Sequence, residues 1–445
     1  MSIFVNYIKK FPTYSFAFCV FFFLFLNLFY NQIMTSLGFG YPRNSFFFLP
    51  QDVFADFFKF IINQNNLSEY FSVPKGEKGY PYITPYLNFS FYYQTNYVNP
   101  PFYALISGVN AIFLKLLNPY LVFFLNILLF LIIFFFQIKN FLIDKKSFLI
   151  IFISSLFSYA VLLMMNRGHI FSAFTCLILI QILINCYLKK NFILNFFLVL
   201  LAFSSKPTAL CFALYIFYYD ISFYKKFIYF FLLLILAPIF YILFNEFNYF
   251  FLGTIWSFYN NFENTLRMNF QDHYYNNYII GDAGLAFGSS LWGFVKIFLR
   301  SFSNFNPHIW VKISFLFCSL IFLIFTLLFF LKKINISVFA YSLVSYYILA
   351  SPVSSDYHLI VFFGPLLLFL KDYENSNNKD LYIVLILTIA FIVSPQHYYF
   401  TEKWDVSWGV NFIPEKTILN PLLILCANFY ILIKTNYTPK KIQEN

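Results

Sequence analysis

The sequence predicts an all-α polytopic membrane protein, and three observations support this class. Hydrophobic residues make up 61% of the 445 positions and charged residues only 11%, whereas soluble domains carry about 25% charged residues. Apolar runs recur from one end of the chain to the other, and in a bilayer such runs satisfy their backbone groups as helices. Lysine pairs separate many of these runs. We therefore expect one integral-membrane domain over residues 1–445.

The lysine pairs also explain the net charge of +11. They lie between apolar runs, as the enrichment of basic residues in cytoplasmic loops predicts, so we expect membrane lipids and no nucleic acid as partners. The first apolar run lacks a convincing small-residue cleavage site and is interpreted as a retained helix. The pairs are Lys9-Lys10, Lys145-Lys146, Lys189-Lys190, Lys225-Lys226, Lys332-Lys333 and Lys440-Lys441.

With these lysines on the cytoplasmic side, the chain crosses the membrane in about 12 passages. Long outer loops follow the first and the seventh passage, over about 35–101 and 245–307. The passages are Tyr14–Met34, Phe102–Phe136, Phe148–Met165, Ile170–Tyr187, Phe192–Phe203, Thr208–Tyr219, Phe227–Phe244, Ile313–Leu331, Ile336–Ala350, Leu359–Leu370, Leu381–Val393 and Ile418–Ile433.

The second passage decides the sidedness of everything after it. Phe102–Phe136 is long, and Asn118-Pro119 interrupts it, which suggests a re-entrant piece followed by a helix. Counted as two full spans, it would place the later lysine pairs outside. Counted as one, it places every histidine on the outer side, together with several charged residues, as a single site requires. These residues are His169, His273, His308, His358, His397, Asp52, Asp56, Arg167, Lys206 and Asp356.

The first outer loop contains two aspartates in the segment Pro50–Phe58. Asp52 and Asp56 are four residues apart, so a helix would carry both on one face, and the neighbouring phenylalanines would hold that helix along the membrane. A carboxylate there can accept a proton from an attacking hydroxyl. Alternatively, Asp52 caps the helix N-terminus. Asp56 lies deeper in the segment and is the stronger candidate base.

Two later interruptions carry cations. Arg167, in Asn166-Arg167-Gly168-His169, must find a partner at the membrane edge. A lipid-linked phosphate suits a guanidinium, and an ion pair with a loop acid is the alternative. Lys206, before Pro207, can hold phosphate as a point charge or can be an interfacial lysine at a helix turn.

The remaining candidates would line a cavity and meet the acceptor. Tyr82 can stack on a sugar ring or anchor the loop at the interface. Arg267 lies in the second long loop, whose glycines would let it close over a lipid donor. Asp356 and His358, two residues apart, can form a polar rim. The histidines and acids match no zinc spacing, so we expect neither a metal nor a cofactor.

Taken in order, these motifs resemble glycosyltransferase family 87, a mannosyltransferase-like branch of the GT-C superfamily that uses polyprenyl-phosphate sugars. The resemblance spans most of the chain, although the Arg167 motif often continues with Gln or Asn where His169 stands here. The motifs are Phe54-Ala55-Asp56-Phe57, Pro81-Tyr82, Asn99-Pro100-Pro101-Phe102, Arg167-Gly168-His169, Ser205-Lys206-Pro207, Ser289-Ser290-Leu291 and Ser351-Pro352-Val353-Ser354-Ser355-Asp356-Tyr357-His358.

The resemblance implies a GT-C-type bundle and an inverting hexosyltransferase on the outer, periplasmic face of a bacterial cytoplasmic membrane. A sugar would pass from a polyprenyl-phosphate donor to a lipid or glycan acceptor. Asp56 would be the base, with Asp52 second, and Arg167, Lys206 and His169 would bind the donor phosphate. The alternatives are an O-antigen-type polysaccharide polymerase, which would depend on outer-loop arginines, and a lipid or glycan transporter, which would show paired repeats.

Overall fold

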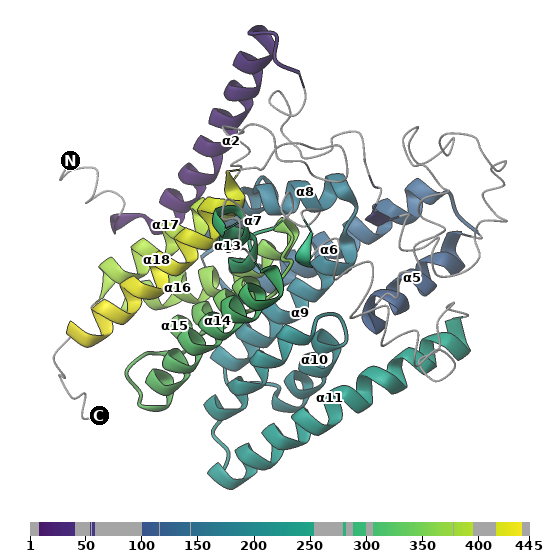
Figure 1. Cartoon of the computed structure of the whole chain (residues 1–445), viewed down its shortest axis with the longest axis vertical. Coiled ribbons are helices and arrows are strands. Elements are labelled where there is room, and N and C mark those ends of the chain that lie inside the picture. Colours follow the sequence, from purple (N-terminus) through teal and green to yellow (C-terminus); the bar gives the residue numbers. More distant parts are fainter. Residues whose placement is uncertain are drawn as a thin grey trace.

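The structure is a computed structural model, and its described part is a bundle of helices (Figure 1). It describes residues 9–40, 54, 56–57, 100–114, 116–142, 144–252, 279–281, 288–299, 306–376, 378–394 and 415–437. Within these residues the β-type pairing is a single antiparallel bridge between Gly288 and Ser355. The all-α class is therefore confirmed for the described part.

Most predicted passages coincide with helices to within a few residues. The helices are α2 Pro12–Ser36, α5 Pro101–Leu114, α6 Pro119–Phe141, α7 Lys145–Leu156, α8 Tyr159–Arg167, α9 Ile170–Tyr187, α10 Phe192–Phe203, the 3₁₀ helix η1 Pro207–Tyr218, α11 Phe223–Leu252, α13 Leu291–Leu299, α14 Pro307–Phe330, α15 Ile336–Leu349, the 3₁₀ helix η4 Asp356–Phe362, α16 Phe363–Asn375, α17 Lys379–Val393 and α18 Lys416–Tyr437.

Six of these helices are long and apolar enough to cross a membrane: those at Pro12–Ser36, Tyr120–Phe141, Ile170–Tyr187, Phe223–Asn248, Pro307–Phe330 and Lys416–Thr435. The number becomes seven if α7 and α8, which meet at a 49° bend, form one span. The chain is thus a multi-pass membrane protein by helix length and composition. The finer count of about 12 passages remains a prediction, because several of the other helices are short.

The second predicted passage divides at the expected place. α5 ends at Leu114, and α6 begins at Pro119, whose preceding Asn118 side chain accepts the backbone N–H of Tyr120 at 2.9 Å. The proline starts the helix, where its missing N–H is harmless. Of the two helices, α6 alone meets the length and hydropathy of a membrane span. This agrees with the predicted division into a short piece and a following helix.

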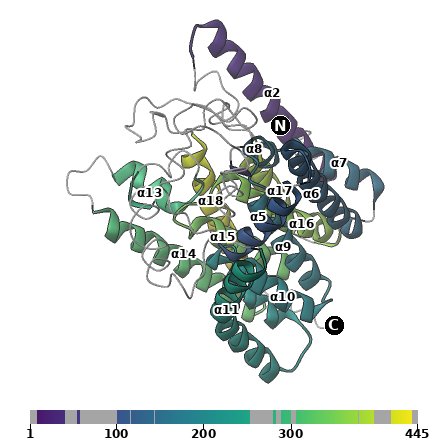
Figure 2. The same ribbon diagram turned by 90° about the vertical axis from the view of Figure 1, so that its right-hand side faces the viewer.

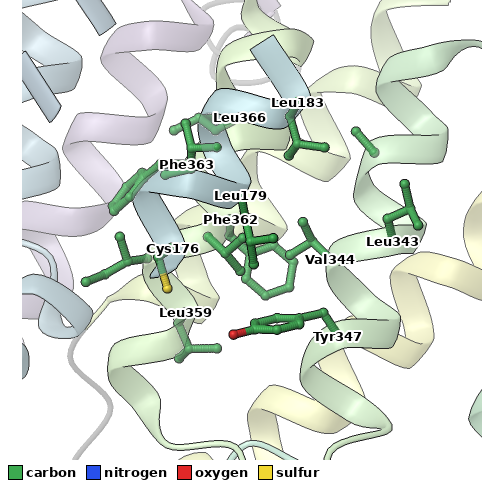
Figure 3. Packing of buried hydrophobic residues seen from close by; sticks show 14 of the residues in the cluster. Cys176, Leu179, Leu183, Leu343, Val344, Tyr347, Leu359, Phe362, Phe363 and Leu366 are labelled. Carbon is green, nitrogen blue, oxygen red and sulfur yellow. The ribbon is translucent and has the colours of Figure 1, made fainter. Parts of the chain in front are cut away.

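The core of the bundle is built around α9 and α15. In α9, 78% of the apolar window is buried inside the protein, against 11% in α11. Figure 3 shows side chains of α9, α15, η4 and α16 interlocking in this core. Gly364 permits a close approach of α16 and α9, because a Cβ there would lie 2.5 Å from Leu183 Cδ1. Small residues allow membrane helices to pack at such distances.

The outer helices expose their apolar side chains. Figures 1 and 2 place α2 and α11 at the edges of the bundle, with α9 and α15 between them. Exposed phenylalanines and leucines run along α2, α11 and α14. Lipid chains cover such surfaces in a membrane protein, so this exposure fits a bilayer environment.

The helices have two chemically different ends. One end, which we call the lysine end, carries most of the exposed lysines next to helix termini. Its tightest cluster surrounds Asp372, which accepts Tyr187 Oη at 2.6 Å, Ser337 Oγ at 2.6 Å and Asn335 Nδ2 at 2.9 Å. The opposite end, which we call the site end, carries the Arg167 and Lys206 motifs. The exposed lysines of the lysine end are Lys10, Lys139, Lys145, Lys146, Lys189, Lys190, Lys225, Lys332, Lys333 and Lys379.

Candidate functional site

The centre of the site end is a two-point ion pair between Asp56 and Arg167. The Arg167 Nε donates to Asp56 Oδ2 at 3.1 Å, and Nη2 donates to Asp56 Oδ1 at 2.9 Å. The side chains are only 11% and 15% exposed for Arg167 and Asp56, respectively. Paired N–H donors matched to both carboxylate oxygens fix the orientation of both groups. Two motifs that are 111 residues apart in the sequence therefore meet.

The backbone around Asp56 is held against the same motif. The Phe54 N–H donates to the Asn166 carbonyl at 2.7 Å. Phe54 has φ = 61°, an unusual conformation for a bulky residue. This left-handed conformation at Phe54 is not that of an α-helix, so it contradicts the predicted helical face at that residue, whereas Asp52 lies outside the described residues. Phe57 is fully buried inside the protein, so this phenylalanine does not lie along the membrane surface as predicted.

Gly168 makes this contact possible. Gly168 has φ = 71° and ends α8 in the left-handed conformation, as glycine does at many helix C-termini. A Cβ at this position would lie 2.8 Å from Phe57 Cβ and 3.1 Å from Phe54 Cα. Both the backbone angle and the close approach thus require glycine. The Asn-Arg-Gly-His motif ends one helix, presents Arg167 and leaves room for the aspartate segment.

His169 extends the site toward η4. Its ring stacks on Tyr357 with centroids 4.1 Å apart, and Tyr103 meets it edge-on at 5.9 Å. The Tyr103 hydroxyl lies 2.7 Å from Ser172 Oγ on α9. Burial raises the pKa of Tyr357 well above its ordinary value, and the charge of Asp56 adds to the increase. Tyr357 therefore lies within the field of the Asp56–Arg167 pair.

Lys206 and His358 form the adjoining part of the site. Lys206 lies between α10 and η1, with its ammonium nitrogen 4.5 Å from the ring centroid of Tyr347. His358 is buried on η4, and its Nδ1 lies 3.2 Å from the Ser355 carbonyl. The positive charges of Lys206 and His169 both lower the pKa of His358, after the larger effect of burial. The cations of separate motifs therefore share one electrostatic environment.

Asp356 belongs to a different, fully buried group. Its carboxylate pairs with Lys416 at the start of α18 and accepts Ser289 Oγ at 3.0 Å. Asn420 donates to the same Ser289 hydroxyl at 3.1 Å. The backbone of Ser289 also donates to Ser354 at 2.8 Å. The Ser289 and Ser351–His358 motifs therefore meet, and Asp356 and His358 are buried side chains, not the polar rim expected from their spacing.

Lys416 is a further residue of this group and was not among the residues predicted from the sequence. It is the first residue of α18 and is 2% exposed, and its ammonium lies 4.9 Å from the ring centroid of Tyr159. A signal was present, because a single lysine begins this apolar run on the side away from the lysine pairs. A buried ammonium there needs an acid as partner.

The predicted residues now separate into three groups. Asp56, Arg167, His169, Lys206 and His358 come together at the site end, whereas Asp356 faces Lys416. Asp52, Tyr82 and Arg267 lie outside the described residues, as do His273 and His397. In the described part of the chain, no group of three or more His, Cys, Asp or Glu side chains could hold a metal ion.

The arrangement suits a reaction between an anion and a proton donor. It brings an oriented carboxylate beside a guanidinium. Tyr357, which stacks on His169 and lies in the field of this pair, connects it to His358 and Lys206. Fixed cations of this kind stabilise charge that develops on a phosphate, and a held carboxylate can accept a proton. No protein-family model matches the sequence, and comparison with curated proteins and with solved structures finds no significant match.

Proposed function

We propose that the protein is a membrane glycosyltransferase that moves a sugar from a polyprenyl-phosphate carrier to a lipid or glycan acceptor. The observation that carries this proposal is the bidentate pairing of Asp56 with Arg167 at the end of the bundle that also holds Lys206 and the two histidines. A base and phosphate-binding cations must lie side by side in such an enzyme, because the reacting carbon is bonded to the phosphate oxygen.

In this mechanism Asp56 accepts the proton of the acceptor hydroxyl while that oxygen attacks the anomeric carbon. The bond between the anomeric carbon and the phosphate oxygen breaks, its electron pair leaves with the lipid phosphate, and the configuration inverts. Arg167 orients Asp56 and, with Lys206 and His169, faces the negative charge that grows on the departing phosphate. Fixed cations supply this stabilisation from the chain's own residues.

The positions of the lysines support an outer location for the site. Exposed lysines mark the cytoplasmic side in most membrane proteins, and here they cluster at the lysine end, opposite Arg167 and Lys206. Cysteine labelling tests this proposal directly. In His308→Cys the thiol should react with a membrane-impermeant reagent added outside intact cells, whereas in Lys332→Cys it should not. The reverse pattern would contradict the proposed sidedness.

The activity is tested with Asp56→Asn in lipid nanodiscs and a set of polyprenyl-phosphate sugars, with products identified by mass spectrometry. Loss of the base should reduce transfer by about 10²- to 10⁴-fold. Asp380→Asn, which changes an exposed aspartate at the lysine end, is the matched control and should retain activity. A melting profile and donor binding close to those of the native chain would confirm that Asp56→Asn is folded. Undiminished transfer by this variant would remove Asp56 from its role.

A further inference from the structure

Two buried nitrogen atoms at the site end have no hydrogen-bond partner among the described residues. They are the ammonium nitrogen of Lys206 and Nε2 of His358. The hydroxyl oxygen of Tyr347 is also buried and likewise has no hydrogen-bond partner among the described residues. Buried polar groups nearly always have partners, and an unpaired ammonium is the most costly of them to bury. Three such atoms in one region indicate a place for a ligand.

The three groups are brought together by α15 and η4. The Tyr347 ring lies under the Lys206 ammonium at 4.5 Å and meets the His358 ring edge-on at 6.1 Å. Cys176 of α9 lies on the same side, with Sγ 3.6 Å from the His358 carbonyl. Figure 3 shows the hydroxyl group of the buried Tyr347 on the side of Cys176 and Leu359. The region is thus walled by apolar residues and supplied with hydrogen-bond donors.

Among the described residues, the charges that act on His358 are the positive ones of Lys206 and His169, and Asp56 acts one residue further away, on Tyr357. The titratable groups that face Lys206 are Cys176 from α9, Tyr347 from α15 and His358 from η4. His169 and Tyr357 are further titratable neighbours of His358. Burial lowers the pKa of Lys206 to about 7. The ammonium therefore loses its proton near neutral pH unless an anion lies beside it.

We propose that Lys206 and His358 bind the phosphate of the lipid donor together with about one proton from solvent. This inference rests on the proposed function and adds its regulation, since donor binding becomes proton-coupled. The anion accepts hydrogen bonds from the Lys206 ammonium and from the N–H of His358. The proton taken up restores the positive charge of Lys206, which the surrounding apolar side chains disfavour in the absence of an anion.

The sign of the pH dependence follows from this linkage. An anion raises the pKa of Lys206 above its value of about 7 without a ligand. At pH values between the pKa of free Lys206 and its pKa with the anion bound, the complex carries one more proton than the free protein. The affinity for the anion therefore falls as pH rises, by up to about tenfold for each pH unit. Below the lower pKa the lysine is already charged, and affinity levels off.

The test is calorimetric binding of a sugar-free polyprenyl phosphate to the full chain in nanodiscs. Titrations at about pH 8, in buffers of different ionisation enthalpy, report directly how many protons are taken up. We expect about one proton per lipid phosphate in the native chain. Lys206→Arg keeps a permanent charge and should bind with little proton uptake and a flat pH profile. Lys312→Arg, a change at an exposed lysine of α14, should behave as the native chain.

The outcomes separate this inference from the proposed function. Binding of the lipid phosphate by the native chain without proton uptake would overturn the inference and leave the donor class standing. No binding of the lipid phosphate at any pH would instead contradict the proposed function. Inorganic phosphate, tested alone, shows whether the head group suffices or the lipid is needed. Because proton uptake is measured on the native chain, the test holds even if a variant fails to fold.

Discussion

The ion pairs of the site end are buried, whereas those of the lysine end are exposed to solvent. At the lysine end, Lys189 pairs with Asp220 at 2.7 Å, with side chains 44% and 76% exposed. At the site end, Lys416 pairs with Asp356, and their side chains are 3% and 0% exposed, respectively. Exposed pairs contribute little because water screens them, whereas a buried pair that loses one partner leaves an uncompensated charge.

The difference indicates what each end does. Lysines in contact with water need no fixed partner, so the lysine end suits orientation in a membrane. Buried cations must be placed by the fold, and at the site end each is held by an acid or by an aromatic ring. Such placement is expensive unless function requires it. Substitutions of matched residues at the two ends test this difference.

The largest effect is expected for Lys416→Met. Asp356 would remain buried without its charged partner, which costs about 3–5 kcal/mol in comparable cases. The thermal unfolding temperature of Lys416→Met in detergent should fall steeply. Lys189→Met at the lysine end should change this temperature little. Adding Asp356→Asn to Lys416→Met should recover part of the loss. Equal effects of the two lysine substitutions would contradict the contrast between the ends.

Gly168→Ala should come next, with Gly38→Ala as its control. Both glycines have positive φ, but a Cβ at Gly168 meets Phe57 at 2.8 Å, whereas at Gly38 nothing lies within 4 Å. The backbone angle alone costs about 1–2 kcal/mol, so the control isolates that effect. Gly168→Ala should destabilise more and lower transfer activity, since it pushes Asp56 away from Arg167. Parity between the variants would show that the contact is not needed.

Asp372→Asn should destabilise the lysine end without affecting the chemistry. The carboxylate accepts hydrogen bonds from Tyr187, Asn335 and Ser337, and weakening them costs about 1–3 kcal/mol. The melting temperature should fall, and transfer per folded molecule should stay constant. A specific loss of transfer would link this cluster to the site and remove the distinction between the ends.

The smallest effect is expected for Asp144→Ala at the lysine end. Asp144 caps α7 by accepting the Ser147 N–H at 2.8 Å, and hydrogen bonds from Ser147 lower its pKa from 3.8. Because the pKa is lower in the folded state, Asp144 stabilises the protein at pH values above its ordinary pKa. This stabilisation is lost as the pH falls through the folded-state pKa. The variant should melt slightly below the native chain at neutral pH, and the difference should vanish in acid.

Part of the candidate site could be predicted from the sequence. Polar residues that interrupt apolar runs are expensive in a membrane, so the positions of Arg167, Lys206 and His358 between such runs made them candidates, and the family resemblance added His169. Lysine pairs indicated which interruptions share a side. Asp56 was selected in the same way, and it does meet Arg167. The roles assigned to these residues stay predictions.

Other features could not be predicted, because they depend on contacts between distant segments. The burial of Phe57 follows from packing against Phe123 and Phe171. The ion-pair alternative for Arg167 was left open, and only the position of Asp56 shows that the pair forms. Asp356 was expected to form a polar rim with His358 because of their spacing, yet its carboxylate pairs with Lys416, since a buried acid needs a charged partner.

A helical, multi-pass protein can be recognised from the order of residues, because hydropathy and lysine placement are local properties of the chain. The pairing of the buried charges, by contrast, depends on the packing of the folded chain. It is set by how α8, α9, α18 and η4 pack, and by whether a glycine lets two segments approach. Whether two charges pair in a low-dielectric interior depends on distances of a few ångströms. Helix packing sets these distances, and the order of residues along the chain does not specify them.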